Sequence, residues 1–194
     1  DSAESVVNVY DPLSAIQVAG TPQSACNSLT ANFTINTPPG FKYFVNFGDG
    51  ILDSSNQKNL THFYSSPGNF SPYILISDKF GCEAVVYGAT INVYGAIPLF
   101  DKDKKSFCDT GTVTFTNFTL NNDPIISSIW NFGDGNMSVA ANPSHLYAIP
   151  GTYYPTLTVT TQNQCTSFYT DTIRVYQTPA LTITGRDTLC LNTT

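Results

Sequence analysis

Two short stretches combine glycine and aspartate with a histidine further along, and these residue types could bind a phosphate, hold a metal or move a proton. The motif Asn-Phe-Gly-Asp-Gly stands at 46–50 and again at 131–135. His62 and His145 follow the two copies and are the only histidines of the chain. Because the whole set occurs twice, any chemistry assigned to one copy has to suit the other.

Phosphate binding would require the glycines to lead into a helix whose N-terminal amides face the anion. Strand-forming residues precede the glycines here, and no helical pattern follows them. The central carboxylates, Asp49 and Asp134, would also repel a phosphate. The motif therefore argues against a phosphate site.

Calcium binding is the second alternative, and it needs about six to eight oxygen ligands. Each glycine turn offers one carboxylate. Asp53 could add a ligand in the first copy, whereas Val139 stands near that place in the second. A site present in only one copy would not explain a shared motif, so the sequence predicts no metal ligand at these turns.

The third alternative is a structural turn at the end of a buried strand. Asp-Gly favours a tight hairpin in which both central residues have positive φ, and the earlier glycine permits a close backbone approach. The carboxylate can accept hydrogen bonds from nearby backbone amides, and Phe47 and Phe132 are expected to point into the core. The predicted turn residues are Gly48, Asp49, Gly50, Gly133, Asp134 and Gly135.

A second shared block, His-x-Tyr-x-x-Pro-Gly, follows each glycine turn. Pro-Gly predicts a type II turn in which glycine takes positive φ. Tyr64 and Tyr147 are predicted to be core rings whose hydroxyls reach the backbone. The histidines are expected to be at least half-buried, and our hypothesis is that each partners the aspartate of its own turn. The predicted turn residues of this block are Pro67, Gly68, Pro150 and Gly151.

These motifs lie on a longer internal repeat. Cys26, Cys108 and Cys190 are spaced by 82 residues each, and a terminal strand recurs as "VVNVY", "TINVY" and "TIRVY". A period of this length suits a small all-β domain better than a solenoid unit of about 20–50 residues. We expect the last strand of one unit at 1–10, whole units at 11–94 and 95–176, and the start of another at 177–194.

Each unit consists of short alternating segments broken by turn residues, which is typical of a β-sandwich. At 156–160, three threonines alternate with Leu157 and Val159, giving one polar and one apolar face. No segment shows the pattern of a long amphipathic helix. The strands expected in the second unit are 96–101, 112–118, 126–132, 154–161 and 166–176.

The cysteines occupy matching places in the two units, one before the second strand and one before the last. Repeat symmetry therefore predicts the disulfides Cys26–Cys82 and Cys108–Cys165, and with them an oxidising compartment. The alternative is two buried free thiols per unit. Zinc binding is less well supported because the chain has no Cys-x-x-Cys pattern.

Composition excludes several classes of function. The net charge of −6 argues against nucleic acid, whose backbone requires a basic face. No apolar run approaches the roughly 20 residues of a membrane helix. The histidines, cysteines and carboxylates form no recognisable triad or metal cluster, so we predict that the chain is not an enzyme.

Together, Phe-Gly-Asp-Gly, His-x-Tyr-x-x-Pro-Gly and a following strand such as "YPTLTVT" at 154–160 resemble the PKD domain, an immunoglobulin-like module. The second unit carries the family's tryptophan at Trp130, whereas Val45 replaces it in the first. The resemblance covers 11–176. It implies tandem extracellular β-sandwiches that act as spacers or adhesive arms of surface proteins, or as accessory modules of secreted hydrolases.

The composition, rich in asparagine and threonine with a cysteine pair per repeat, is similar to large surface adhesins of gliding Bacteroidota. We therefore expect a non-catalytic structural or adhesive array at the cell surface. Its expected partners are neighbouring PKD-like domains and a surface glycan or protein. The alternative is a substrate-binding accessory module of a secreted hydrolase, with candidate binding rings at Tyr43, Phe80, Tyr87 and Tyr169.

The resemblance implies two further kinds of site. Some PKD modules of bacterial collagenases bind calcium through acidic residues near the start of the domain. Asp11, Asp101 and Asp103 lie in comparable regions here without a position-by-position match, so no calcium site is assigned. The Asp-Ser/Thr-apolar pattern of O-glycosylation in gliding bacteria matches at Ser2, Thr172 and Thr188.

Overall fold

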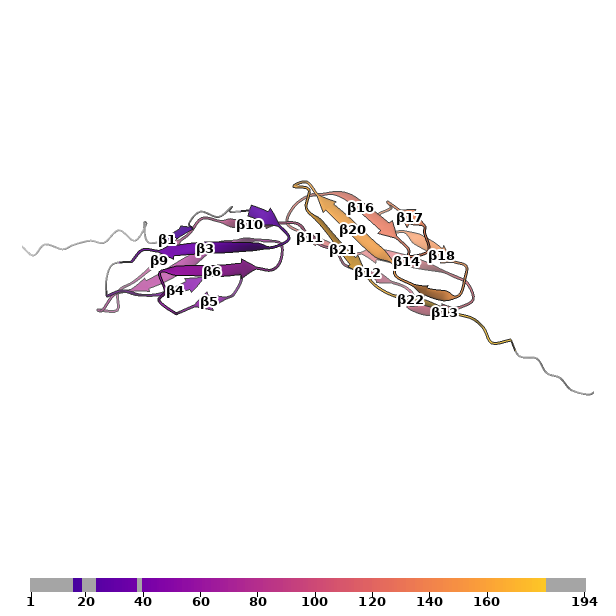
Figure 1. Ribbon diagram of the computed structural model, residues 1–194, viewed down its shortest axis with the longest axis horizontal. Helices are drawn as coiled ribbons and strands as arrows, with labels where there is room; N and C mark the ends of the chain where they lie inside the picture. The colour runs from indigo at the N-terminus through magenta and orange to yellow at the C-terminus, as the bar shows by residue number, and fades with distance from the viewer. Residues whose placement is uncertain (1–15, 19–23, 38–39, 181–194) are drawn as a thin grey trace, which may run out of the picture.

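The computed structural model describes residues 16–18, 24–37 and 40–180 of the chain. These residues form two β-sandwich domains that lie end to end and meet at Gly95 (Figure 1). Every regular element among them is a strand, so the all-β prediction is confirmed. In the same residues there is no helix of the length and apolarity needed to span a membrane.

The described residues of the first domain form three sheets. One has the strand order β1 (Ile16–Val18), β3 (Leu29–Ile35), β6 (Asn59–Tyr64). The second has the order β5 (Leu52–Asp53), β4 (Lys42–Asn46), β8 (Tyr73–Ser77), β9 (Glu83–Tyr87). The third is β2 (Ser24–Cys26), β10 (Ile91–Tyr94), β7 (Gly68–Phe70), in which β2 runs parallel to β10.

The second domain repeats this plan. Its sheets are β12 (Phe100–Lys102), β14 (Gly111–Asn117), β18 (Ser144–Tyr147), then β17 (Met137–Ser138), β16 (Ile125–Asn131), β20 (Thr156–Thr161), β21 (Thr166–Thr170). The third sheet is β13 (Ser106–Cys108), β22 (Ile173–Tyr176), β19 (Gly151–Tyr153), again with a parallel pair, β13 and β22. A short additional pair joins β11 (Ala96–Ile97) to β15 (Leu120–Asn121).

Two of the strands predicted for the second domain are interrupted. The segment 166–176 divides into β21 and β22, which belong to different sheets. The chain changes sheet at Asp171, whose carboxylate accepts a hydrogen bond from the next backbone amide. The segment 96–101 divides at Pro98, which has no amide to contribute to a ladder. The sequence did not predict β13, β18 and β19, which have only three or four residues each.

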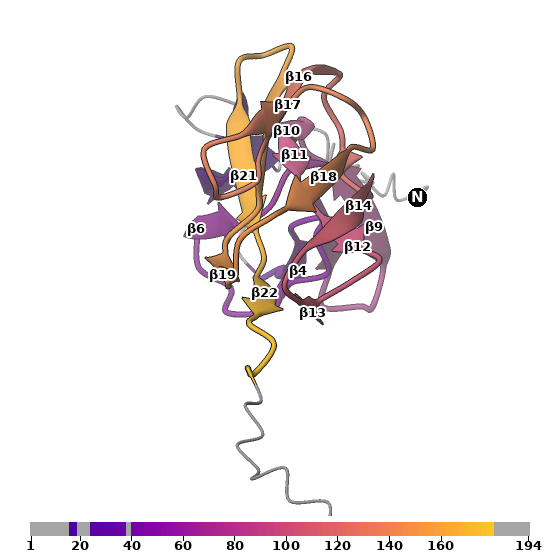
Figure 2. The same cartoon turned by 90° about the vertical axis from the view of Figure 1, so that its right-hand side faces the viewer.

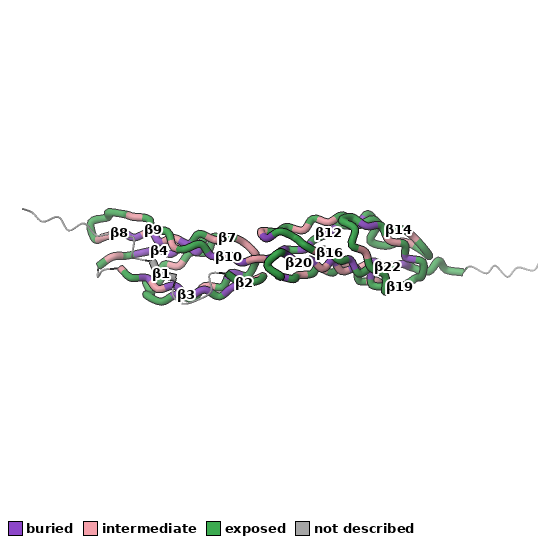
Figure 3. The backbone as a smooth tube through the Cα atoms, turned by 90° about the horizontal axis from the view of Figure 1, so that it is seen from above, coloured by how far each residue is buried: buried purple, intermediate pink, exposed green. Residues whose placement is uncertain are grey.

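Each domain has its own apolar core between the sheets, seen as the buried stretches along the strands in Figure 3. Alternation produces it, since Leu157 and Val159 of β20 are fully buried between partly exposed threonines. A large apolar side chain contributes about 1.5–3 kcal/mol when it is fully buried. The two cores, rather than the contact between the domains, therefore hold the chain folded.

The domains follow one long axis. Figure 2 looks along that axis from the second domain and shows the strands of the first domain behind it. The sheet containing β13 and β22 lies at the far end of the second domain, whereas β8 and β9 lie at the far end of the first (Figures 1 and 3). Features on these sheets are therefore separated by the length of both domains.

Candidate functional site

The first glycine turn closes the β4–β5 hairpin over the core. The amide of Phe47 donates to the carbonyl of Ile51 at 3.1 Å, and the Phe47 ring is buried beside Val45. The second turn closes β16–β17 in the same way, with Phe132 buried beside Trp130. The predicted buried strand followed by its turn is confirmed in both domains.

Close backbone packing explains the first glycine of each turn. A Cβ at Gly48 would lie 2.7 Å from the amide nitrogen of Ser71, and a Cβ at Gly133 would lie 2.7 Å from that of Tyr154. Both glycines also have positive φ, 86° and 83°. Any other residue would collide with the backbone of the neighbouring strand connection.

The predicted turn type is wrong, because positive φ at both Asp and Gly is not observed. Gly50 and Gly135 have φ of 92° and 93°, but neither aspartate is among the described residues with positive φ. The loop uses a glycine on each side of the aspartate instead. That arrangement leaves the carboxylate free to turn back toward the backbone and toward the histidine.

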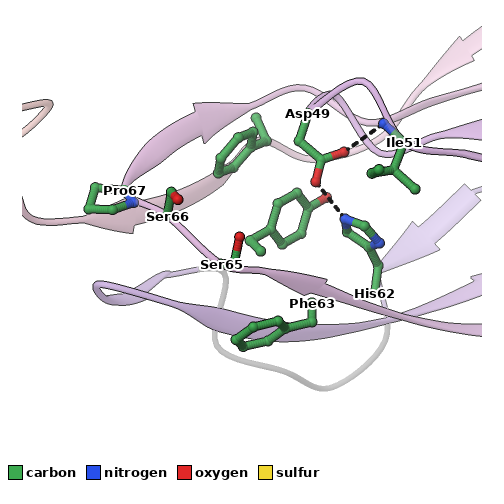
Figure 4. A pocket seen from close by; sticks show the side chains of 9 residues that line it. Asp49, Ile51, His62, Phe63, Ser65, Ser66 and Pro67 are labelled. Atoms are coloured by element: carbon green, nitrogen blue, oxygen red, sulfur yellow. Dashed lines mark hydrogen bonds and ion pairs between the residues drawn. The ribbon is translucent and has the colours of Figure 1, made fainter. Parts of the chain in front are cut away.

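Each aspartate links its turn to the histidine of the same domain (Figure 4). The Oδ1 atom of Asp49 accepts a hydrogen bond from the Ile51 amide at 3.0 Å, and its Oδ2 atom lies 2.7 Å from Nε2 of His62. Asp134 and His145 show the same 2.7 Å contact. The hypothesis that each histidine partners the aspartate of its own turn is confirmed.

Aromatic rings surround each Asp–His pair. The His62 ring stacks on Phe47 with 4.0 Å between ring centroids. The rings of His62 and Tyr64 form a T-shaped pair with 4.7 Å between their centroids. The Tyr64 hydroxyl donates to the Phe47 carbonyl at 2.8 Å, and the equivalent Tyr147 donates to Phe132 at 3.0 Å. The prediction of core tyrosines bonded to the backbone is confirmed. We call each Phe, Asp, His and Tyr set a turn cluster.

The lowered pKa values of the two aspartates favour a structural role over proton transfer. Burial alone would raise the pKa of Asp49, but the hydrogen bonds from His62 and from the Ile51 amide outweigh it and hold the pKa below its usual value. Asp134 is held low in the same way by His145 and Asn136. A general base works best with a pKa near the ambient pH, so these carboxylates are poorly suited to that role.

The hollow beside the first turn cluster contains the residues that could do chemistry. Asp49, His62, Ser65 and Ser66 are among its lining residues (Figure 4). Asp49 and His62 bind each other across it, and Asp49 also receives a backbone amide. Among the described residues, no three histidine, cysteine or acidic side chains form a group that could hold a metal. The geometry is that of a turn fastened to the neighbouring strand.

The Pro-Gly positions differ from the prediction of a type II turn. Gly68 and Gly151 open β7 and β19 and do not have positive φ. A Cβ at Gly68 would lie 2.6 Å from the Phe70 ring, which stacks on Tyr64 at 4.5 Å. The first of these glycines therefore makes room for an aromatic ring of the core, not for a left-handed backbone.

The disulfide connectivity also differs from the prediction, since Cys26 is bonded to Cys165 in the other domain. The bonded residues are 139 apart in sequence, with 5.2 Å between their Cα atoms. Cys82 and Cys108 carry free, exposed thiols. The predicted bonds Cys26–Cys82 and Cys108–Cys165 are wrong.

The reason is that the two cysteines of a domain lie at its opposite ends. Cys26 ends β2, directly beside Tyr94, the last residue of β10 before the second domain. Cys82 lies in the turn between β8 and β9, and these two strands lie toward the outer end of the first domain (Figure 3). The observed bond therefore joins the first cysteine of one domain to the second cysteine of the other.

Hydrogen bonds flank this disulfide at the contact between the domains, which we call the junction. The Asn27 side chain donates to the carbonyl of Thr166 at 2.9 Å, and the Asn122 side chain donates to the carbonyl of Val93 at 2.8 Å. Gly95, between the domains, has φ of 147°, and a Cβ there would lie 2.5 Å from Oδ1 of Asn27. The junction is thus joined by the peptide chain, one disulfide and side-chain hydrogen bonds.

The four aromatic residues proposed for ligand binding separate into two groups. Tyr43 is buried, and Tyr169 packs against Phe100 in the core of the second domain. Phe80 and Tyr87 are 80% and 71% exposed. The strand registers place Thr170 at the position equivalent to Tyr87. Exposed rings from this set therefore occur on the first domain and are not matched on the second.

The remaining predicted positions are the candidates for calcium binding and for O-glycosylation. The carboxylates of Asp101 and Asp103 accept hydrogen bonds from the amides of Lys102 and Thr114, both at 2.8 Å. Thr172 is half-buried between β21 and β22. Three positions lie outside the described residues: Ser2, Asp11 and Thr188.

Sequence reasoning missed two polar contacts of the second domain. Lys102 is buried and forms a close ion pair with Asp171. Asp123 is buried and accepts the Asn163 amide at 3.0 Å and its side chain at 2.9 Å, which fixes the turn that carries Cys165. Lys102 stands two residues after the core residue Phe100, so strand alternation predicts that its side chain points inward. Nothing in the sequence indicates the partner of Asp123.

Comparison with known proteins places these features in a family. The model of the PKD domain matches residues 14–93 and 96–175. Collagenase ColA of Bacillus cereus is 43% identical over 119 residues, which are 56% of this chain and 12% of that protein. Microbial collagenase of Vibrio alginolyticus is 35% identical over 80 residues, 40% of this chain and 9% of that protein. The chain therefore spans about a tenth of the length of these two relatives.

Solved structures of single domains are also similar. The PKD1 domain of Vibrio anguillarum Epp has 27% identity and a TM-score of 0.38, covering 43% of this chain and 96% of its own. The PKD1 domain of the Vibrio cholerae metalloprotease PrtV has 28% identity and a TM-score of 0.38, covering 42% and 98%. Since the family model matches both β-sandwiches over most of their length, the chain belongs to the PKD-domain family and comprises two PKD domains in tandem.

Proposed function

We propose that the two PKD domains form a non-catalytic, stiff arm of an extracellular protein. The observation that carries this proposal is the junction, where the disulfide Cys26–Cys165 bonds one domain to the next. A disulfide of this kind persists in oxidising compartments, in keeping with an extracellular position.

The junction restricts motion that tandem domains usually have. Domains joined by a single peptide link are expected to move relative to each other unless their interface is large and apolar. Here the chain passes through Gly95, and a second covalent link connects the turns at Cys26 and Cys165. Two separate points of attachment oppose bending and twisting, and the Asn27 and Asn122 hydrogen bonds add to them.

The protein that carries the arm is, in our proposal, a secreted hydrolase, with the arm as an accessory module. The similarity to PKD regions of two collagenases supports this alternative better than a surface adhesin. The adhesin of a gliding bacterium, its glycan or protein ligand and the O-glycosylation at Thr172 stay predictions from the sequence.

A surface of the first domain could contact a polymeric substrate of such a hydrolase. Phe44, Leu75 and Val85 stand opposite one another on β4, β8 and β9, and Phe44 is 52% exposed. The Tyr73 and Tyr87 rings lie 5.7 Å apart on the same sheet. We call this set the outer apolar face; a face of this kind is typical of a contact surface.

The stiffness of the arm can be measured by small-angle X-ray scattering of the whole chain. Oxidised protein is expected to give the profile of an elongated, rigid particle. A Cys26→Ser, Cys165→Ser variant should give a broader distribution of sizes, because only the peptide link and hydrogen bonds remain. The matched control, Cys82→Ser with Cys108→Ser, should leave the profile unchanged. Identical profiles for all three proteins would contradict the arm.

The accessory role can be tested by retention on insoluble collagen fibres. We expect the chain to be retained, and a Phe44→Ala, Tyr87→Ala variant to be released, since both rings lie on the outer apolar face. Phe168→Ala is the control, because Phe168 is equally exposed but belongs to the second domain. No retention of the unmodified chain would argue against a collagen-binding accessory module while leaving the arm intact.

A further inference from the structure

We propose that Cys82 and Cys108 are each one half of a further interdomain disulfide, whose other half is the equivalent cysteine of an adjoining PKD unit. Every junction of the array would then carry the covalent link seen at Cys26–Cys165. The proposal extends the stiff arm proposed above beyond the two described domains.

Cys108 occupies the position of the bonded Cys26. In the first domain the register of the parallel pair places Cys26 beside Tyr94, and in the second it places Cys108 beside Tyr176. The carbonyl of Cys26 accepts the Ser28 amide at 2.7 Å. The carbonyl of Cys108 accepts the amide two residues further on at 2.9 Å. The backbone therefore presents both sulfur atoms in the same way.

The residue after each cysteine strengthens this equivalence. Asn27 and Asp109 both have left-handed backbones, with φ of 64° and 60°. Their amides donate to the carbonyls of Tyr94 and Tyr176, at 2.8 Å and 2.7 Å. Cys108 is thus held at the exit of the second domain, as Cys26 is held at the exit of the first.

Cys82 occupies the position of the bonded Cys165. The carbonyl of Cys82 accepts the Asp78 amide at 3.0 Å, and that of Cys165 accepts the Thr161 amide at 3.0 Å. The residue before each cysteine has positive φ, 84° at Gly81 and 62° at Gln164. The two hairpin turns share these backbone hydrogen bonds and the positive φ, while their side-chain bonds differ, with Asp78 in the Cys82 turn and Asp123 in the Cys165 turn. The backbone therefore presents Cys82 as the receiving half of a junction.

The two free thiols cannot bond to each other within one chain. The elements that carry them, the β8–β9 turn and β13, lie at opposite ends of the pair of domains (Figures 1 and 3). Each is exposed on the face that another unit of the array would meet. The sequence supplies the equivalent landmark, since Cys190 follows Cys108 by the same 82 residues that separate Cys108 from Cys26.

The two exits differ in their side chains, since Asp109 stands in place of Asn27 and Gln177 follows Tyr176 where Gly95 follows Tyr94. Asn27 donates to Thr166 across the junction, whereas the carboxylate of Asp109 accepts the amide of Thr178 at 2.8 Å and bonds its hydroxyl. Asp109 therefore holds the chain that leaves the second domain. The sulfur position does not depend on this side chain, because backbone hydrogen bonds set it at both exits.

Bond formation at each site balances as a thiol–disulfide exchange. The two thiols lose two protons and two electrons and form one S–S bond. A small-molecule or protein disulfide accepts the electrons and protons and leaves as two thiols. An oxidising compartment supplies this class of oxidant.

The test adds one unit to the existing chain, by joining residues 1–176 to a second copy of 95–194. Cys190→Ser removes the cysteine that lies outside the described residues. Refolding in a glutathione redox buffer and peptide mass mapping without reduction should show two bonds. One is Cys26 to the first Cys165, and the other is the first Cys108 to the Cys165 of the added copy. A first Cys108 that stays alkylatable, or bonds elsewhere, would overturn the proposal.

A second chain tests the other end, with residues 1–94 joined to 11–194 and the same Cys190→Ser change. Here the Cys26 of the first copy should bond to the Cys82 of the added copy, and a free Cys82 would overturn the proposal for that residue. Formation of Cys26–Cys165 in the same sample reports folding, and its absence counts against the shared pattern too. Scattering of the original two-domain chain tests the stiff arm separately, so failure of one idea is distinguishable from failure of the other.

Discussion

The two domains share a turn cluster but fill their cores differently. The cluster has nearly the same distances in both, with 2.7 Å between aspartate and histidine in each. The core residue two positions before the phenylalanine of the cluster is Val45 in the first domain and Trp130 in the second. Trp130 is fully buried, donates to the Ala140 carbonyl at 3.0 Å and packs on Phe100 at 5.0 Å. The fold tolerates different core fillers, whereas both domains keep the cluster.

The outer faces of the two domains differ as well. In the first domain the Tyr73 and Tyr87 rings are neighbours. The equivalent pair in the second is Thr156 and Thr170, whose hydroxyls lie 2.8 Å apart. The second face keeps exposed apolar side chains at Ile129 and Phe168, but threonines replace the tyrosine pair. The two faces therefore differ chiefly at the tyrosine pair, which is found on the first domain and replaced by threonines on the second.

The largest expected effect comes from the core position that differs. Trp130→Ala should lower the free energy of unfolding of the second domain by about 3–5 kcal/mol. Val45→Ala removes far less buried apolar area and should cost the first domain about 2 kcal/mol. Urea unfolding followed by circular dichroism would show the two transitions in both variants, whereas tryptophan fluorescence serves only Val45→Ala, because Trp130 is the only tryptophan of the chain. Equal losses in the two domains would contradict the unequal role of these cores.

The two glycines of one turn should differ in how much an alanine substitution destabilises the domain. The difference should be the same in both domains. Gly48→Ala and Gly133→Ala place a methyl group 2.7 Å from a backbone nitrogen and force positive φ, at a combined cost of about 2–5 kcal/mol. Gly50→Ala is the matched control, since open space surrounds that position and only the backbone cost of about 1–2 kcal/mol applies. Thermal melting compares them, and a control as damaging as Gly48→Ala would refute the close approach.

Removal of the tyrosine hydroxyl should lower the free energy of unfolding equally in the two domains. Tyr64→Phe and Tyr147→Phe each leave a buried phenylalanine carbonyl without its donor. An unsatisfied buried acceptor costs about 1–3 kcal/mol. Chemical denaturation of each variant would measure the loss. An effect confined to one domain would show that the clusters are not equivalent.

The smallest expected effect is a dependence on acidity. Both cluster aspartates have a pKa below the usual value in the folded chain, because hydrogen bonds from histidine and backbone outweigh burial. Their contribution is therefore complete above the unfolded pKa of about 3.9 and is lost as the pH falls through the folded pKa. Asp49→Asn with Asp134→Asn should flatten the fall in melting temperature in acid. Unchanged slopes for the variant would exclude this contribution.

Local chemistry could be predicted from the sequence, but the disulfide could not. The Asp49–His62 contact, the buried Phe47 and the Tyr64 hydrogen bond each depend on residue types at fixed short spacing. The disulfide depends on which end of the domain a cysteine occupies. Cys26 reaches the junction because the three-residue β2 runs parallel to β10, and a strand that short gives no pattern in the sequence.

The internal repeat does not decide how the cysteines are paired. A cysteine pair that recurs in every unit can bond within a unit or between neighbours, and both patterns have the same period. Only the positions of the two turns in space decide between them. Likewise, glycine after proline indicated a left-handed turn, while packing of Phe70 on Tyr64 is what excludes a side chain at Gly68.

The covalent link between the domains can be tested directly by peptide mapping of the 194-residue chain without reduction, after oxidation at low protein concentration. We expect a peptide pair that joins Cys26 to Cys165, with Cys82 and Cys108 recovered as alkylated thiols. Recovery of Cys26 bonded to Cys82, together with Cys108 bonded to Cys165, would contradict it. That result would leave the two domains joined by the peptide chain and by hydrogen bonds, without the second covalent link on which the stiff arm depends.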